Sequence, residues 1–289
     1  MVGPRLKSLL TFLKEIRVEH TLFALPFAYT GAIFAAHGLP SAHALIWITL
    51  AVLGARTAAM AANRYFDRAI DARNPRTAGR AIPSGRLAPS VMLWAALIGI
   101  AVLVIAAWQL NPLCVKLLPV AALGALFYPL CKRFTWSTHF VLGAVDALAP
   151  LGAFIAIRGT VDVAAILLFL AVTVWVAGFD ILYALMDLQV DRTQAIRSLP
   201  ARFGETGARR LAMWLHMLMA ALLTAAGIFE RAGALYALGI LAAIGLLIYE
   251  GRLLATVENI FALNDRVFTA NMAFSVVFLA TTLAAFTLA

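Results

Sequence analysis

Three polar residues recur at four-residue intervals where a long apolar segment ends: Asn63, Asp67 and Asp71. Residues four apart lie on one face of a helix, so these side chains are predicted to share about two turns of one helix. A run of arginines and a Pro-Ser-Gly turn follow, up to Leu87. The spacing therefore predicts an acidic helix end that faces a basic loop.

A second acidic series ends another apolar segment: Asp180, Asp187 and Asp191, also predicted on one helix face. A single carboxylate at a helix end is ordinarily just solvated, but two clusters repel one another unless a cation lies between them. Mg²⁺ prefers oxygen ligands and bridges carboxylates to diphosphate. Asp67, Asp71, Asp187 and Asp191 are therefore predicted as metal ligands and as catalytic residues.

Further ionisable residues lie inside or near the apolar segments. Arg56 precedes Asn63 by seven residues and so lies on the same helix face, deeper in the membrane. Two interpretations stand, a structural ion pair with Asp180 or a counter-charge for an acidic substrate. Arg17 and His20 could serve the same purpose, with a snorkelling Arg and a packed His as the alternatives.

Tyr128 and Lys132 stand four residues apart at the end of another apolar segment. Lys132 is placed either to hold a diphosphate or simply to anchor the helix at a basic membrane surface. Asp146, in the middle of a span, has no predicted role beyond an ion pair with Arg158 or with a cavity residue. Asn271 is predicted to make a hydrogen bond between helices.

The composition bounds the fold class. Of 289 residues, 63% are hydrophobic, whereas soluble domains have about 45–50%. Because the apolar segments are about 20 residues long, the chain is predicted to be an all-α integral membrane protein with one domain. The nine predicted spans are 19–37, 42–64, 91–109, 114–131, 138–157, 162–186, 208–228, 232–254 and 267–288.

The basic residues of the loops indicate the topology. With nine spans, nearly all loop arginines and lysines fall on one side, and only Lys116, Arg158 and Arg231 fall on the other. This asymmetry predicts a cytoplasmic N-terminus, cytoplasmic acidic clusters and an external C-terminus. The net charge of +9 is then explained by topology and anionic membrane lipid, and nucleic acid is not an expected partner. Residues 4–18 are predicted to form a helix on the membrane surface.

The chain also carries a weak internal repeat. Each acidic helix end is followed by a basic loop with a proline turn, RAIPSGRL at 80–87 and RSLPARFG at 197–204. The two units lie on the same predicted side, which favours two parallel pseudo-repeats, about 19–131 and 138–254, plus a last helix. The cysteines, Cys114 and Cys131, match no metal-binding spacing and are expected to pack as apolar residues.

The segment NRYFDRAID, from Asn63 to Asp71, resembles the NxxxDxxxD motif of the UbiA superfamily of intramembrane aromatic prenyltransferases. The segment DLQVD, preceded by Asp180 and Tyr183, resembles the second Asp motif of that superfamily. NPRTAGRAIPSGRL and YPLCKRFT are similar to the 4-hydroxybenzoate polyprenyltransferase branch. EHTLFALPFAYTGA and FDILYALMDLQVDRTQAIRSLPARFG are similar to UbiA-like enzymes of the futalosine route to menaquinone.

The resemblance implies nine transmembrane helices around a central cavity, capped by two cytoplasmic loops. It also implies Mg²⁺ at the Asp motifs, a polyprenyl diphosphate donor and an aromatic acceptor. Positions 188–190 lack the extra acidic residues that some members carry. The substrate-binding residues predicted around the four aspartates are Asn63, Arg56, Tyr128, Lys132, Asp180 and Tyr183.

The resulting hypothesis is Mg²⁺-dependent transfer of a polyprenyl group to a hydroxylated aromatic acid, 4-hydroxybenzoate or a dihydroxynaphthoate, in ubiquinone or menaquinone synthesis. The expected location is the inner membrane of a bacterium. A secondary transporter of an anionic solute is the alternative, because it too places ionisable residues in the bilayer. The segment from Asp187 to Arg210 is predicted to be mobile until the diphosphate binds.

Overall fold

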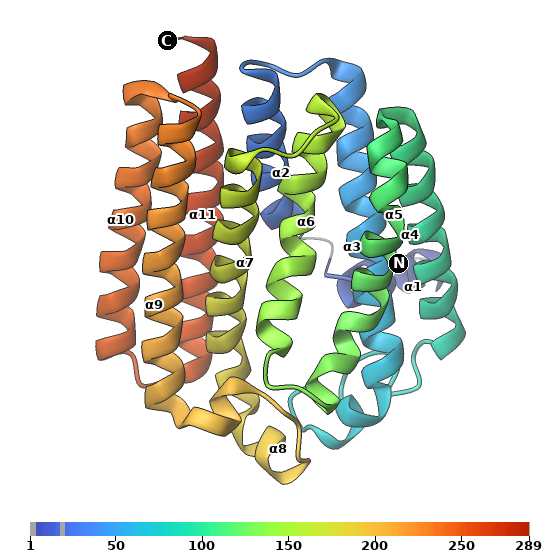
Figure 1. Cartoon of the computed structure of the whole chain (residues 1–289). Helices are drawn as coiled ribbons and strands as arrows, with labels where there is room; N and C mark the ends of the chain where they lie inside the picture. The colour runs from blue at the N-terminus through green and yellow to red at the C-terminus, as the bar shows by residue number, and fades with distance from the viewer. Residues whose placement is uncertain (1–3, 18–20, 289) are drawn as a thin grey trace.

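The computed structural model describes residues 4–17 and 21–288, and all regular elements in these ranges are helices (Figure 1). In chain order they are α1 (Pro4–Glu15), α2 (Thr21–Ala36), α3 (Ala42–Arg73), α4 (Pro89–Leu110), α5 (Pro112–Phe127), the 3₁₀ segment η2 (Tyr128–Arg133), α6 (Thr138–Arg158), α7 (Val163–Ala184), the 3₁₀ segment η3 (Leu185–Asp187), α8 (Leu188–Thr193), α9 (Leu199–Phe229), α10 (Gly233–Thr256) and α11 (Ile260–Thr287).

The helix lengths support a protein that crosses the membrane many times. Within the described ranges, eight helical segments are long and apolar enough to span a membrane, and a shorter apolar helix covers Ala24–Ala36. Together they correspond to the nine predicted spans. His20 lies outside the described residues, as do Val18 and Glu19.

Three helices extend beyond the predicted limits. α3 continues past 64 to Arg73, and α11 begins at Ile260 rather than 267. α9 begins at Leu199 rather than 208, with a kink at Gly204, whose φ of 71° suits a residue without a side chain. The predicted limits followed the apolar residues, whereas these helices continue into polar sequence beyond them.

Small residues let neighbouring helices approach closely. A Cβ atom built on Gly54 of α3 would lie 2.7 Å from the carbonyl oxygen of Gly99 on α4. A Cβ on Gly99 would lie 2.6 Å from the carbonyl oxygen of Gly54. Because only glycine fits at such contacts, α3 packs directly along α4. This contact sets the position of the helix that carries the first acidic series.

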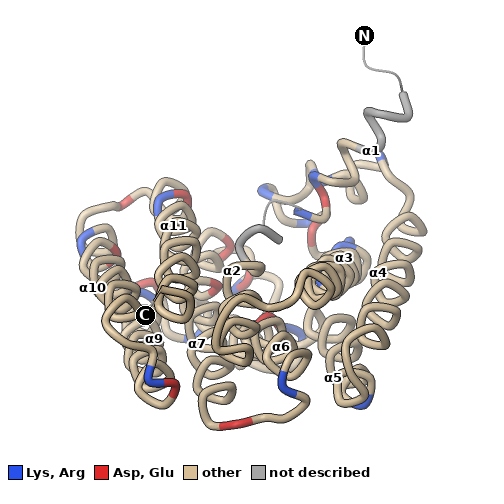
Figure 2. The backbone as a smooth tube through the Cα atoms, turned by 90° about the horizontal axis from the view of Figure 1, so that it is seen from above, with Lys and Arg blue, Asp and Glu red and all other residues tan. Residues whose placement is uncertain are grey.

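The largest hydrophobic core lies away from α3 and α4, on the side of the bundle formed by α2, α7 and α11. It is centred on Trp175, Phe27, Phe274 and Phe278, from α7, α2 and α11. Seen from above, α9, α10 and α11 group beside α7, while α3, α4 and α5 group on the far side of α6 (Figure 2). α6 and α7 thus join two helical groups.

The second acidic series does not lie on one regular helix face, which corrects the prediction. α7 ends at Ala184, the chain tightens into η3, and the short α8 follows from Leu188. The break changes the directions of Asp187 and Asp191 relative to Asp180, because a 3₁₀ helix has three residues per turn rather than the 3.6 of an α-helix. The end of α3, the loop after it, η2 and α8 all lie at the same end of the bundle, away from the C-terminus (Figure 1).

The predictions for Cys114, Cys131 and Asn271 agree with the structure. Both cysteines are free and partly buried, without a disulfide. Asn271 of α11 donates a hydrogen bond from Nδ2 to Glu250 Oε1 of α10 and accepts one at Oδ1 from Trp175 Nε1 of α7. The amide therefore joins three helices, as a buried polar side chain in a membrane bundle is expected to do.

Candidate active site

The first acidic series lies as predicted on a single regular helix. Asn63, Asp67 and Asp71 belong to the last turns of α3, and both carboxylates are buried, Asp67 with only 1% of its surface exposed. Asn63 donates from Nδ2 to Asp67 Oδ2 at 3.0 Å. Four-residue spacing on an unbroken helix is sufficient to bring these groups together.

The second series reaches the same place through the helix break. Asp187 ends η3, and Asp191 lies within α8. The hydroxyl of Ser198, the N-cap residue of α9, donates to Asp191 Oδ2 at 2.6 Å. Asp191 is therefore held by the start of α9.

These elements surround one cavity of about 260 Å³. All ten of the predicted site residues line it, together with Asp146, His139, Arg76 and Arg80. The ten are Arg56, Asn63, Asp67, Asp71, Tyr128, Lys132, Asp180, Tyr183, Asp187 and Asp191. Residues more than a hundred positions apart in the sequence thus share a single polar pocket.

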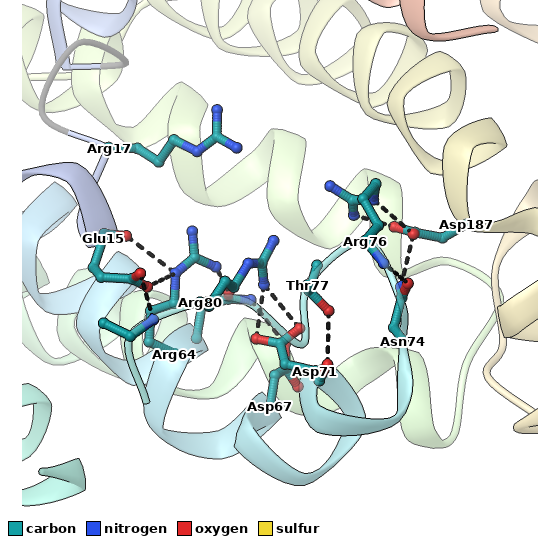
Figure 3. Close-up of polar contacts among 12 residues, drawn as sticks. Glu15, Arg17, Arg64, Asp67, Asp71, Asn74, Arg76, Thr77, Arg80 and Asp187 are labelled. Carbon is teal, nitrogen blue, oxygen red and sulfur yellow. Dashed lines mark hydrogen bonds and ion pairs between the residues drawn. The ribbon is translucent and has the colours of Figure 1, made fainter. Parts of the chain in front are cut away.

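Basic side chains contact both carboxylates of the first series. Lys132 Nζ lies 2.5 Å from Asp67 Oδ2, and Arg80 Nη1 lies 2.7 Å from Asp71 Oδ2. Figure 3 shows Arg80 on Asp71. In each pair the cation offsets a negative charge that would otherwise be costly so far from water.

The loop after α3 connects the two acidic series. Arg76 donates from Nε to Asp187 Oδ1 at 2.8 Å and also pairs with Asp187 through Nη2, while Asn74 Nδ2 donates to Asp187 Oδ1 at 2.8 Å (Figure 3). Burial opposes the charge of Arg76, but the hydrogen bond and the attraction to Asp187 outweigh it and raise the pKa of this guanidinium. The sequence offered these arginines only as part of a basic loop.

α1 supports the same loop, which the sequence did not indicate. The backbone carbonyl of Glu15 accepts from Arg64 Nε at 3.0 Å, and Glu15 Oε1 accepts from the backbone N–H of Ala81 at 2.7 Å. Glu15 and Arg64 are both buried. The predicted surface helix is therefore also a brace between α3 and its loop.

The deeper part of the cavity contains a second pair of opposite charges. Arg56 Nη1 lies 2.8 Å from Asp146 Oδ1, so the partner of Arg56 is Asp146 of α6 and not Asp180, the partner suggested under one of the two interpretations. Asp146 was expected to pair with Arg158 or with a cavity residue. Its partner is the cavity residue Arg56, whereas Arg158 pairs with Asp162. The Nε of Arg56 is buried without a hydrogen-bond partner, so one donor of this guanidinium stays available.

Two further predicted residues meet at the cavity wall. Arg17 Nη2 lies within 3.4 Å of the hydroxyl of Tyr183, and both residues line the cavity. Tyr128 is buried at the start of η2 and lines the same wall. Aromatic faces are thus present beside the acidic groups.

The cavity offers carboxylate oxygens but no complete metal site within the described residues. Within residues 4–17 and 21–288, no three His, Cys, Asp or Glu side chains lie close enough together to hold an ion by themselves. Mg²⁺, however, keeps several waters and takes one or two carboxylates plus substrate phosphates. Asp67 Oδ1 is buried and has no hydrogen-bond partner, so a carboxylate oxygen is available for such a shared site.

Comparisons with known proteins agree with this geometry. The family model "UbiA prenyltransferase family" matches residues 24–260. A 4-hydroxybenzoate octaprenyltransferase of Tolumonas auensis is 33% identical over 212 residues, 68% of this chain and 74% of that protein. The apo structure of a UbiA homolog from Aeropyrum pernix K1 has a TM-score of 0.81 and 31% identity, covering 91% of this chain and 96% of that one. A UbiA homolog from Archaeoglobus fulgidus bound to GPP and Mg²⁺ shares the fold, with a TM-score of 0.70 and 18% identity over 96% of this chain and 99% of that one. The chain belongs to the UbiA prenyltransferase family.

Proposed function

We propose that this chain transfers a polyprenyl group from polyprenyl diphosphate to a hydroxylated aromatic acid, with Mg²⁺ as cofactor, in quinone biosynthesis. The observation that carries the proposal is the convergence of Asp67, Asp71, Asp187 and Asp191, from distant parts of the chain, on one cavity that basic side chains also line. Family membership favours transfer chemistry over the transporter alternative.

The diphosphate would occupy the end of the cavity between α3 and α8. Asp67, Asp71, Asp187 and Asp191 would hold Mg²⁺ there, and the metal would stabilise the charge of the leaving diphosphate. Lys132, Arg76 and Arg80, which contact three of these carboxylates, can turn toward the phosphate oxygens once the ion neutralises the acids. Asn63 would orient Asp67 through its hydrogen bond.

Tyr128 and Tyr183 would face the allylic carbon as its bond to oxygen breaks. An aromatic face stabilises nearby positive charge, and exclusion of water protects a reactive cation. Both rings belong to the lining of the polar cavity. These residues therefore suit the part of the reaction in which positive charge develops.

The hydrocarbon chain has a second cavity available. This cavity, of about 270 Å³, shares Arg56 and Asp146 with the polar one and is otherwise lined mainly by aliphatic side chains such as Ile48, Leu103 and Leu148. Apolar walls favour a prenyl chain over water. The free donor of Arg56 suits the carboxylate of the acceptor.

The remaining parts of the proposal concern the membrane and the loops. The chain would lie in the inner membrane of a bacterium, with the N-terminus and both acidic series on the cytoplasmic side. Residues 19–131 and 138–254 would be parallel pseudo-repeats. The segment from Asp187 to Arg210 would close over the diphosphate, and its protease accessibility should fall when Mg²⁺ and donor are added together.

The deciding experiment is a transfer assay with purified protein in lipid vesicles. One prenyl diphosphate, with or without Mg²⁺, is offered together with 4-hydroxybenzoate or a dihydroxynaphthoate. A prenylated aromatic product that requires Mg²⁺ supports the proposal and identifies the acceptor. Uptake of an anion into sealed vesicles, without any product, would contradict it.

A further inference from the structure

Asp180 differs from the other carboxylates of the cavity in its partner. Asp67, Asp71, Asp146 and Asp187 each contact an arginine or lysine. In the described part of the chain, the one hydrogen bond of the Asp180 side chain joins Oδ2 to His139 Nδ1 of α6 at 2.6 Å. The Asp180 side chain lines the cavity and remains 27% exposed.

The surroundings of His139 determine which nitrogen carries the proton. Leu199 donates its backbone N–H to His139 Nε2 at 3.2 Å, so Nε2 must be the unprotonated acceptor. The proton of a neutral imidazole then lies on Nδ1, which donates it to Asp180. The hydrogen bond from His139 therefore holds Oδ2 of Asp180. Oδ1 of Asp180 makes no hydrogen bond to any described residue.

The start of α9 holds His139 in place. His139 is buried, and Leu199 is the first residue of α9, whose N-cap is Ser198. The Ser198 hydroxyl donates to Asp191. The start of α9 therefore orients two acids of the cavity at once, Asp191 through Ser198 and Asp180 through His139.

Alkylation of an aromatic ring requires a proton acceptor. A carboxylate paired with a cation accepts a proton poorly, because protonation breaks the ion pair. Among the described residues, Asp180 pairs with no arginine or lysine, it is oriented by a neutral donor, and its side chain lines the cavity. Asp191 likewise pairs with no arginine or lysine of the described residues, but it is one of the four proposed metal ligands.

We propose that Asp180 is the catalytic base that removes the ring proton, and that His139 is its positioning residue. This inference rests on the proposed prenyl transfer. In the reaction, a bond forms between the allylic C1 of the donor and a ring carbon, while the C1–O bond breaks and its electron pair leaves with diphosphate. The proton on that ring carbon passes to Asp180 Oδ1, and the electrons of the C–H bond restore the aromatic ring.

The test uses an acceptor that carries deuterium at the ring carbon that is alkylated. With wild type, proton removal follows the slow bond-breaking step, and we expect no primary isotope effect on turnover. In Asp180→Asn, turnover should fall about 100-fold or more, and a primary isotope effect should appear because proton removal becomes slow. Calorimetric binding of geranyl diphosphate with Mg²⁺ should remain close to that of wild type, which verifies that the variant is folded.

His139 is tested by matched substitutions. In His139→Asn the amide nitrogen takes the place of Nδ1 and can still donate to Asp180, whereas in His139→Gln the amide takes the place of Nε2. Asn should therefore retain much more turnover than Gln or Ala, and the isotope effect should grow only in Gln and Ala. A structural role alone would lower stability and turnover in all three without changing the isotope effect.

The outcomes separate the two proposals. If wild type forms no prenylated ring from any acceptor, the proposed function fails and the role of Asp180 fails with it. If wild type is active while Asp180→Asn binds donor, stays within threefold of wild-type turnover and shows no isotope effect, the prenyl transfer stands and the base assignment is wrong.

Discussion

Two polar clusters lie within the helical bundle, and they differ in how completely they are satisfied. The closed cluster consists of Trp175, His216, Glu250 and Asn271, all buried between α7, α9, α10 and α11. Its contacts are His216 Nδ1 to Glu250 Oε2 at 2.6 Å, Asn271 Nδ2 to Glu250 Oε1 at 2.5 Å, and His216 Nε2 to the Trp175 carbonyl at 3.1 Å. In the candidate active site, by contrast, Asp67 Oδ1 and Arg56 Nε are buried without hydrogen-bond partners, although Arg133 Nη2 lies 3.7 Å from Asp67 Oδ1.

Ionisable residues inside a membrane suggest function by default, but the closed cluster shows that such residues can also serve only to join helices. The closed cluster pairs its polar side-chain atoms with one another and with backbone carbonyls and joins helices. The active site instead leaves one oxygen, Asp67 Oδ1, and one nitrogen, Arg56 Nε, without a hydrogen bond in residues that line a cavity. The two histidines show the same contrast. His216 faces an acceptor on each nitrogen, the pattern of an imidazolium paired with a carboxylate, whereas His139 faces one donor and one acceptor.

The largest expected effect is on turnover, from substitution of the acidic series. Asp67→Asn and Asp187→Asn should each lower kcat by about 10²–10³-fold, because loss of one electrostatic contact to the developing charge costs about that much. Thermal unfolding should change little. Asp265→Asn, on the exposed start of α11, is the matched control. Near-normal turnover in either variant would make that residue a solvated helix end.

Substitution in the closed cluster should lower stability and leave turnover nearly unchanged, the opposite of what is expected for the acidic series. Glu250→Ala leaves His216 and Asn271 buried without their partner and should cost about 3–5 kcal/mol of stability. Turnover per folded molecule should stay close to that of wild type. Thermal unfolding in detergent and an active-site titration measure the two quantities, with exposed Glu258→Ala as control. A stable but inactive Glu250→Ala would place this cluster in the mechanism.

Substitutions of Arg56 and of Asp146 should change the KM for the acceptor in opposite directions. Arg56→Gln should raise the KM for an acidic acceptor about ten- to a hundred-fold, the value of a charge-assisted contact of about 1.5–3 kcal/mol. Asp146→Asn should lower that KM, since Arg56 no longer shares its charge with Asp146. The KM of the donor should change in neither variant. Equal changes for donor and acceptor would make the pair purely structural.

The smallest effect is expected at a surface pair. Arg158 and Asp162 lie four residues apart with Nη1 and Oδ2 at 3.1 Å, each about a third exposed. Arg158→Ala should change the free energy of unfolding by less than about 0.5 kcal/mol. The same unfolding assay measures it beside Glu250→Ala. If the free energy of unfolding fell as much in Arg158→Ala as in Glu250→Ala, burial would not determine how much such a pair contributes to stability.

The sequence predicted what depends on local spacing. Asn63, Asp67 and Asp71 lie where a four-residue period on one helix puts them, and Asn271 joins helices as expected. The ion pair suggested between Arg56 and Asp180 does not form, because the approach of α3 to α6 depends on packing, and Asp180 and Asp146 are equally plausible carboxylates in the sequence.

The helix break before Asp187 could not be predicted from local preference. Leu185 and Met186 are strong helix formers, and the tertiary context overrides that preference. The roles of Glu15 and His139 were also missed. Neither belongs to a spaced motif, and each acts through a residue far away in the sequence, Ala81 and Asp180 respectively.

The central claim is that the two acidic series bind one diphosphate through shared metal. Calorimetric binding of inorganic pyrophosphate tests it, with and without Mg²⁺, for wild type, Asp67→Asn, Asp187→Asn and the double variant. We predict binding by wild type only with Mg²⁺, at least about a tenfold loss in each single variant, and a less than additive loss in the double, because both residues act on one site. Pyrophosphate binding by wild type that is equally tight when Mg²⁺ is chelated would contradict the account.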